Sequence, residues 1–212
     1  MTAPLPAALP LPMFPLGAVL FPHAALPLHV FEPRYRALVR DCLRHGLEFG
    51  VVLIERGHEV GGGDTRFGVG TVARIREAAE LADGRWALVC AGTRRLTVRA
   101  WLPDDPYPLA LVEDRPDGAL SPATAEHLAV AEGAVRRALA LAGELGEAVA
   151  PATVELHPDP AVAAWQLAAV APLGPVDHQR LLEIDDAAAR LNVLTALATD
   201  ASALLAYRLS GG

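Results

Sequence analysis

The chain of 212 residues contains no lysine, and arginine therefore supplies all 18 of its basic side chains. A lysine is essential to a Ser-Lys dyad, to a Schiff base and to the nucleotide-binding P-loop. Residues 63–70 have the glycine spacing of a P-loop, but Val69 stands where that loop needs its lysine. The residues of this chain therefore supply neither a P-loop for ATP hydrolysis nor a Ser-Lys peptidase centre.

Side chains for nucleophilic catalysis are also scarce. The three serines are Ser121, Ser202 and Ser210, and none of them stands in a G-x-S-x-G elbow. No CxxC or Cys/His spacing surrounds the two cysteines, Cys42 and Cys90. We expect both to be reduced thiols in the core rather than a disulfide, a zinc site or a nucleophile. The sequence predicts no catalytic residue.

Metal ligands and membrane segments show no clear pattern either. The seven histidines include no H-x3-H pair. His23 and His29 flank a proline-rich strand, and two roles stay open for them: binding one ligand together, or a structural hydrogen bond for each. Four prolines among the first twelve residues argue against a signal peptide, and Gln166 and Pro172 interrupt the most apolar stretch. We therefore expect a cytoplasmic protein without a metal or cofactor.

Between residues 11 and 39, five prolines interrupt a run of large apolar residues. Because each proline lacks a main-chain donor, residues 16–21 and 26–31 are expected to form short strands at an edge or beside a bend. Pro33 suits the first position of a helix. The apolar stripe that follows it at helical spacing consists of Tyr35, Leu38, Val39, Cys42 and Leu43.

Strand patterns continue to about residue 112. The expected strands cover residues 49–54, 69–75, 85–90, 96–101 and 109–112. Residues 61–64 are typical of a flexible tip, Asp83-Gly84 of a hairpin and Gly92-Thr93 of a further turn. Successive antiparallel strands of this length favour a small closed or nearly closed barrel.

Helical patterns replace the strand patterns after residues 114–118. Ser121 before Pro122 and Asp159 before Pro160 are expected helix N-caps. Alanine-rich helix faces allow close approach, which favours a compact bundle. The sequence therefore predicts a strand-rich lobe over residues 1–118, with one helix near 33–45, and a helical lobe over residues 119–212.

Charge is distributed unevenly between these lobes. Residues 1–120 hold 13 arginines against 14 acidic residues, and residues 121–212 hold 5 against 11, which gives net charges of −1 and −6. An acidic lobe repels a polyphosphate backbone, which argues against nucleic-acid binding. For one group of arginines two interpretations stay open, a solvated strand face and a local anion-binding site. The group consists of Arg74, Arg76, Arg94, Arg95 and Arg99.

Several stretches resemble the N-terminal substrate-binding domain of Lon proteases. Its opening is similar to LPMFPL at residues 11–16, VLFP at 19–22 and PLHVFEPRY at 27–35. Later strands of that domain resemble residues 67–75, 92–98 and 107–110, and its helical end resembles residues 173–175, 179–183 and 190–191. The resemblance implies an α+β fold, in which a PUA-like pseudo-β-barrel precedes an α-helical bundle. It implies the recognition domain alone, without the ATPase and peptidase parts.

Residues 29–35, at the strand-to-helix junction, are the strongest candidate site. We expect Glu32 to interact with unpaired N–H groups of the helix and to pair with Arg34 or Arg36, either as an internal clamp or as a contact surface. Exposed aromatic anchors are expected in a groove between the lobes. The candidate partner-binding residues are Phe14, Phe21, His29, Phe31, Glu32, Arg34, Tyr35, Trp101, Tyr107 and Trp165.

These patterns and the resemblance lead us to expect a non-enzymatic module that binds an unfolded peptide or a partner protein, within a protease system. Two alternatives stay open, a hydrolase or small-ligand-binding enzyme in the interlobe cleft and an RNA-binding barrel. An enzyme requires a pocket with a buried, pKa-shifted cluster, whereas a binding module requires an apolar groove. RNA binding requires a strong dependence on salt.

Overall fold

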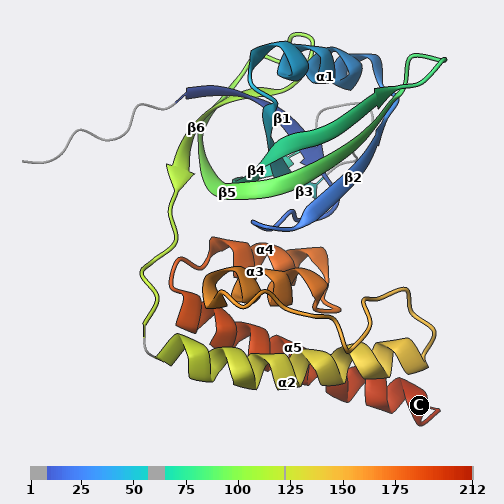
Figure 1. Cartoon of the computed structure of the whole chain (residues 1–212), viewed down its shortest axis with the longest axis vertical. Coiled ribbons are helices and arrows are strands. Elements are labelled where there is room, and N and C mark those ends of the chain that lie inside the picture. Colours follow the sequence, from blue (N-terminus) through green and yellow to red (C-terminus); the bar gives the residue numbers. More distant parts are fainter. Residues whose placement is uncertain (1–8, 57–64, 122, 212) are drawn as a thin grey trace, which may run out of the picture. The chain divides into compact units, whose positions relative to one another are not determined.

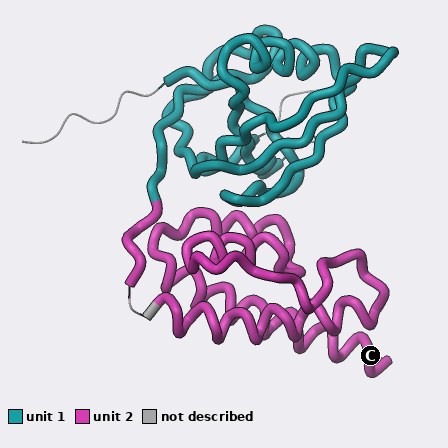
Figure 2. Tube along the Cα trace, viewed as in Figure 1, with its two compact units in different colours: residues 1–116 teal, residues 117–212 magenta. Residues whose placement is uncertain are grey.

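A computed structural model describes residues 9–56, 65–121 and 123–211 (Figure 1). The chain divides into two compact units, residues 1–116 and 117–212 (Figure 2). The loop tip expected at residues 61–64 lies outside the described residues.

The described residues of the first unit form one helix and a mixed sheet. Its elements are β1 (Leu9–Leu16), β2 (Ala25–Val30), α1 (Pro33–His45), β3 (Glu48–Arg56), β4 (Thr65–Glu80), β5 (Trp86–Leu102) and β6 (Leu109–Arg115). The strand order is β2-β5-β4-β3-β1-β6, and β6 also pairs with β5, so that five of these six strands form a ring. Of the strand pairs that the structure describes, only that of β1 and β3 is parallel. Strand β2 lies outside the ring and pairs with β5.

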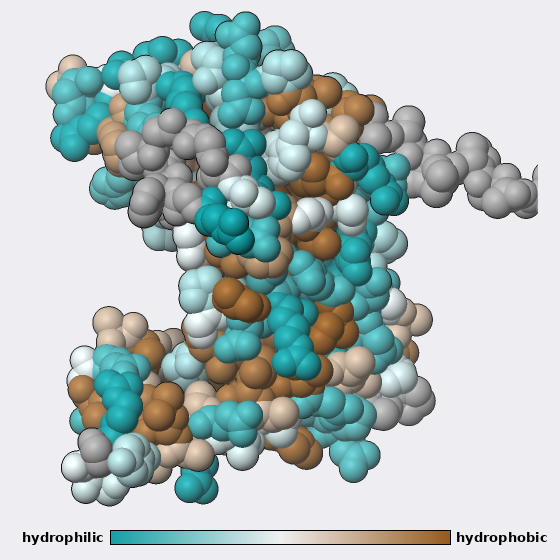
Figure 3. Space-filling model, turned by 180° about the vertical axis from the view of Figure 1, so that it is seen from behind, coloured by the Kyte–Doolittle hydropathy of each residue, from teal (hydrophilic) through white to brown (hydrophobic). Residues whose placement is uncertain are grey.

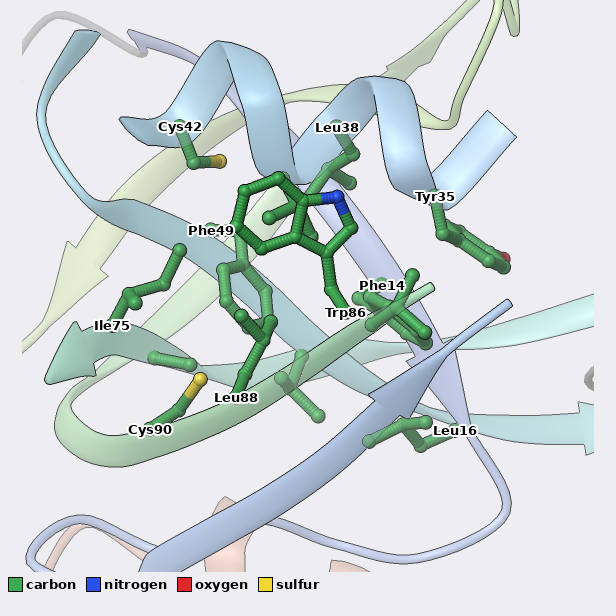
Figure 4. Packing of buried hydrophobic residues seen from close by; sticks show 14 of the residues in the cluster. Phe14, Leu16, Tyr35, Leu38, Cys42, Phe49, Ile75, Trp86, Leu88 and Cys90 are labelled. Carbon is green, nitrogen blue, oxygen red and sulfur yellow. The ribbon is translucent and has the colours of Figure 1, made fainter. Parts of the chain in front are cut away.

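Two apolar clusters hold this sheet together because its central strands are buried on both faces. One cluster packs beneath α1 and includes Phe14, Tyr35, Leu38, Phe49 and Trp86 (Figure 4). The other cluster draws on β1, β3, β4, β5 and β6, and it consists of Met13, Val52, Val72, Leu96, Ala110 and Val112. Strand β4, expected to be half-buried, is therefore buried on both faces from Val69 to Ala73.

Helix α1 follows the sequence pattern closely. Pro33 stands at its start, and Tyr35, Leu38, Val39 and Cys42 are buried. The stripe is nevertheless narrower than expected, since Leu43 is 37% exposed. The helix ends where Gly46 adopts a positive φ of 134°, which glycine tolerates without a Cβ clash.

Two predictions about the strands were wrong. Residues 17–21 form no strand, because β1 ends at Leu16 and the loop after it is held by other bonds, such as that from Thr71 Oγ1 to the carbonyl of Leu20 (2.6 Å). No turn forms at Gly92-Thr93 either, because β5 runs unbroken from Trp86 to Leu102. Gly92 is needed instead for close approach, since a Cβ there would collide with the carbonyl of Phe21.

The second unit is a bundle of four described helices. They are α2 (Ala123–Glu144), α3 (Pro160–Val170), α4 (Pro175–Glu183) and α5 (Ala187–Leu209). The expected cap at Asp159 is present, since its carboxylate accepts a hydrogen bond from the N–H of Ala161 (2.9 Å). Ala131, Val135, Ala138 and Ala142 are buried on α2, and Leu191, Leu194, Ala198 and Leu205 on α5. Among the described helices, none is long and apolar enough to cross a membrane.

Candidate functional site

A small pocket opens in the first unit where β1, β2 and the start of α1 meet. Its volume is about 90 Å³. We call it the β2–α1 pocket, and its walls are Phe14, Leu16, Leu28, His29, Val30, Phe31, Glu32 and Tyr35. A volume of this size accommodates roughly three water molecules or one branched apolar side chain. The structure thus brings together five candidates from separate elements, namely Phe14, His29, Phe31, Glu32 and Tyr35.

Two stacked aromatic rings form the inner wall of the pocket. The rings of Phe14 and Tyr35 lie nearly parallel, with centroids 4.1 Å apart and planes at 14° (Figure 4). Phe49 stands behind Phe14, with a centroid distance of 6.0 Å. Because these rings also belong to the core beneath α1, the wall is rigid and apolar.

An ion pair lies at the mouth of the pocket. Arg34 Nε donates to Glu32 Oε2 over 3.1 Å, and these side chains are only 20% and 17% exposed. The guanidinium of Arg34 also stacks over the ring of Tyr35, 4.5 Å from its centroid. Glu32 occupies the N-cap position of α1 but makes no side-chain cap bond, so its charge is directed to Arg34 instead of the helix N–H groups. The pairing with Arg34 follows the expectation, and the capping contact does not.

Two exposed side chains also line the pocket. Phe31 is 56% exposed although it is a large hydrophobic residue, and His29 is also exposed. Single exposed apolar side chains are common on protein surfaces, and Phe31 is singled out here because it lines an apolar pocket. The face seen in Figure 3 carries several apolar patches separated by polar side chains on each unit. Apolar surface alone therefore does not distinguish the β2–α1 pocket from these patches. Its concave shape beside the exposed ring of Phe31 does.

The remaining aromatic candidates lie elsewhere. Phe21 and Trp165 are each 1% exposed, so neither is an exposed anchor. Trp165 donates through Nε1 to Asp117 Oδ2 (2.7 Å) and packs under Arg190 in the second unit. Phe14 and Tyr35 are buried too and contribute only the pocket wall.

Trp101 and Tyr107 have partners of their own in the first unit. The ring of Trp101 is covered by the guanidinium of Arg66, 4.4 Å from its centroid. The hydroxyl of Tyr107 donates to Asp41 Oδ2 over 2.9 Å, and burial together with that carboxylate raises the pKa of Tyr107 to about 12. Neither residue lines the β2–α1 pocket.

A second hollow of about 310 Å³ near Tyr107 bears on the enzymatic alternative, because Asp41, Cys42, His45 and Glu48 contribute to its lining. Burial raises the pKa of the Cys42 thiol to about 12, with a smaller effect of Asp41. A thiol with that pKa stays protonated near neutral pH and is a poor nucleophile. Among the described residues, no group of three histidine, cysteine or acidic side chains is placed to hold a metal ion.

The arginines of β4 and β5 bear on the nucleic-acid alternative. Arg94 pairs with Glu48 (3.0 Å) and with Asp114 (2.8 Å), and Arg99 pairs with Glu113 (2.7 Å). Arg95 is buried and donates to the carbonyl of Pro116. Because these guanidinium groups already have acceptors in the protein, they do not form the unneutralised basic stripe that phosphate binding requires.

Sequence reasoning missed the aliphatic walls of the pocket. Leu16 closes β1, while Leu28 and Val30 point to the same side of β2. In the sequence, Leu28 and Val30 alternate with Pro27 and His29, and this alternation is the feature that indicates a shared strand face. It predicts a half-buried strand, but not which element the buried side faces.

Most of the chain is similar to proteins of one known family. The family model of the ATP-dependent protease La (LON) substrate-binding domain matches residues 10–200. Lon protease 2 of Sorangium cellulosum is 29% identical over 203 residues, which cover 92% of this chain and 25% of that protein. The Lon protease of Anaeromyxobacter dehalogenans is 34% identical over 105 residues, 49% of this chain and 12% of that protein. This chain thus spans a quarter or less of these curated relatives.

Solved structures give the same result. The Lon N-terminal domain protein from Xanthomonas campestris superposes with a TM-score of 0.65 at 34% identity, over 89% of this chain and 98% of that chain. The N-terminal domain of the Mycobacterium avium complex Lon protease shares the fold, with a TM-score of 0.60 at 18% identity over 90% of this chain and 98% of that chain. The α+β fold and the resemblance seen in the sequence are both confirmed, and the chain belongs to the Lon substrate-binding domain family.

Proposed function

We propose that this chain is a non-enzymatic recognition module that binds unfolded polypeptide for a protease system. The observation that carries the proposal is the β2–α1 pocket, where apolar walls and the exposed ring of Phe31 adjoin a neutralised ion pair. Unfolded chains differ from folded ones by exposing large apolar side chains. A pocket for one such side chain is suited to a recognition step of this kind.

The geometry favours weak and tolerant binding. The pocket is small, and an unfolded segment must lose conformational entropy when it binds, so the net affinity is expected to be micromolar or weaker. The net charge of the chain is −7, which favours segments flanked by basic residues over acidic ones. Salt then weakens the basic-flanked segments modestly and leaves the apolar contribution in place.

The non-enzymatic part of the proposal rests on two observations. The chain has no lysine for a P-loop or a Ser-Lys dyad, and the Cys42 thiol is held in its protonated form. Purified protein is therefore expected to hydrolyse no ATP and to leave casein intact. ATPase or peptidase activity that is present in the purified wild type and absent from a variant that no longer folds would contradict this expectation.

Fluorescence anisotropy tests the proposal directly. The probes are three fluorescein-labelled decapeptides with the same leucine- and phenylalanine-containing centre and with arginine, serine or aspartate flanks. The proposal predicts saturable binding in the order arginine, serine, aspartate, with the differences shrinking at 0.5 M NaCl. Absence of binding by all three peptides below millimolar concentration would reject it, and it would favour an adaptor for one folded partner.

A further inference from the structure

The β2–α1 pocket adjoins a strand edge that has no neighbour among the described residues. Strand β2 pairs with β5 from Ala25 to Val30, and its other edge pairs with no described strand. Unpaired strand edges present main-chain donors and acceptors that recruit a further strand. Since His29 and Val30 both line the pocket, this edge and the pocket form one continuous surface.

The ladder shows which main-chain groups of β2 point outward. The N–H of Gly92 donates to the carbonyl of Ala24 over 2.9 Å, which is one of the two bonds of a hydrogen-bonded pair, while the N–H of Ala24 donates to the carbonyl of Phe21. In an antiparallel ladder such pairs recur at every second residue. The main-chain groups of Leu26, Leu28 and Val30 therefore face β5.

The remaining residues of β2 present their main-chain groups at the free edge. By the same alternation, the N–H groups of Ala25 and His29 point away from β5. Pro27, between them, has no N–H and offers its carbonyl alone. The edge thus presents the N–H groups of Ala25 and His29 with the carbonyls of Ala25, Pro27 and His29.

This pattern suits an extended polypeptide better than a second copy of the same edge. Two β2 edges paired with each other would set proline against the partner strand and lose main-chain donors on both sides. An unfolded segment without proline supplies N–H donors at every second residue, in the spacing that the three carbonyls require. It also places every second side chain on one face, so that one apolar side chain reaches the pocket.

We propose that an unfolded polypeptide segment binds as an added antiparallel or parallel strand on the free edge of β2, with one apolar side chain in the β2–α1 pocket. The proposal rests on the proposed function and deepens it, because it makes the main chain the principal feature that is recognised. Main-chain pairing is independent of sequence, and the pocket adds only a preference for an apolar residue.

A matched pair of variants at His29 tests this inference. His29→Pro removes the outward N–H at a position where no bond to β5 is lost, whereas His29→Ala removes the imidazole and keeps the N–H. For the arginine-flanked peptide, we expect the affinity of His29→Pro to be about three- to tenfold lower than that of His29→Ala, which reports the loss of the imidazole from the pocket wall alone. Thermal unfolding of both variants verifies that the fold is retained.

Hydrogen exchange of wild-type amides gives a second readout that needs no variant. Saturating peptide is expected to slow exchange at Ala25 and His29, while Leu26, Leu28 and Val30 are already protected by β5. If peptide binds but both amides exchange as before and His29→Pro binds like His29→Ala, main-chain pairing is wrong and the proposed function stands. If no peptide binds the wild type, the proposed function itself fails.

Discussion

The ring of Phe14 stacks on the ring of Tyr35 with a centroid distance of 4.1 Å, and this contact joins β1 to the first turn of α1. The two residues are 21 positions apart in the sequence. Their stack is both part of the core and the inner wall of the β2–α1 pocket. Under the proposed function, stability and recognition share these rings, so informative variants must be chosen around them rather than at them.

Arg34→Ala is expected to destabilise the first unit by about 1–3 kcal/mol, because it removes a partly buried charge-assisted bond to Glu32 and the stacking on Tyr35. Chemical unfolding measures the change. Arg44→Ala is the matched control, since Arg44 is 69% exposed and lies 3.8 Å from Asp41, and its loss should change stability by less than about 0.5 kcal/mol. An Arg34→Ala protein of wild-type stability that binds no peptide would make Arg34 a contact residue instead of a clamp.

Gly70→Ala is expected to destabilise the protein by about 2 kcal/mol or more, because a Cβ there would collide with the carbonyl of Val51 and the side chain of Val52 across the β3–β4 ladder. Gly68→Ala, on the same strand, is the control, since a Cβ at that position has no atom within 4 Å. Urea unfolding curves compare the two variants. Equal stabilities would show that β4 can shift to accept the methyl group.

The two cysteines are expected to react slowly with a thiol reagent at pH 8 in the folded protein. Burial raises the pKa of Cys42 to about 12 and that of Cys90 to about 11, from 9.0, which lowers the thiolate fraction by roughly a hundredfold or more. Both folded pKa values are raised, so the stability they contribute is complete below pH 9 and is lost as pH rises through 11 to 12. Labelling rates with and without urea measure the effect, and equal rates would contradict the burial.

Local rules predicted the elements around the site, while long-range register decided which residues meet. Pro33 and the spacing from Tyr35 to Cys42 identify α1 because the signal lies within one segment. Register between β1 and its neighbours determines that Phe14 lines the pocket, and the same proline-rich pattern does not show that Phe21 is buried. Gly92 was mistaken for a turn because its close contact with Phe21 is tertiary. Residues 29–35 were thus recognisable as a strand-to-helix junction, whereas their packing against Phe14 and Leu16 of β1 was not.

The central claim is that the β2–α1 pocket with Phe31 binds unfolded polypeptide, and Phe31→Ala tests it most directly because this ring is 56% exposed and contributes little to the core. Leu204→Ala is the control, since Leu204 is 61% exposed on α5 in the other unit. The measurement is the Kd of the arginine-flanked peptide for the wild type and both variants. We expect Kd to rise about five- to thirtyfold in Phe31→Ala, as for loss of a large apolar contact, and to stay within twofold in Leu204→Ala. Equal Kd values for all three folded proteins would contradict the account.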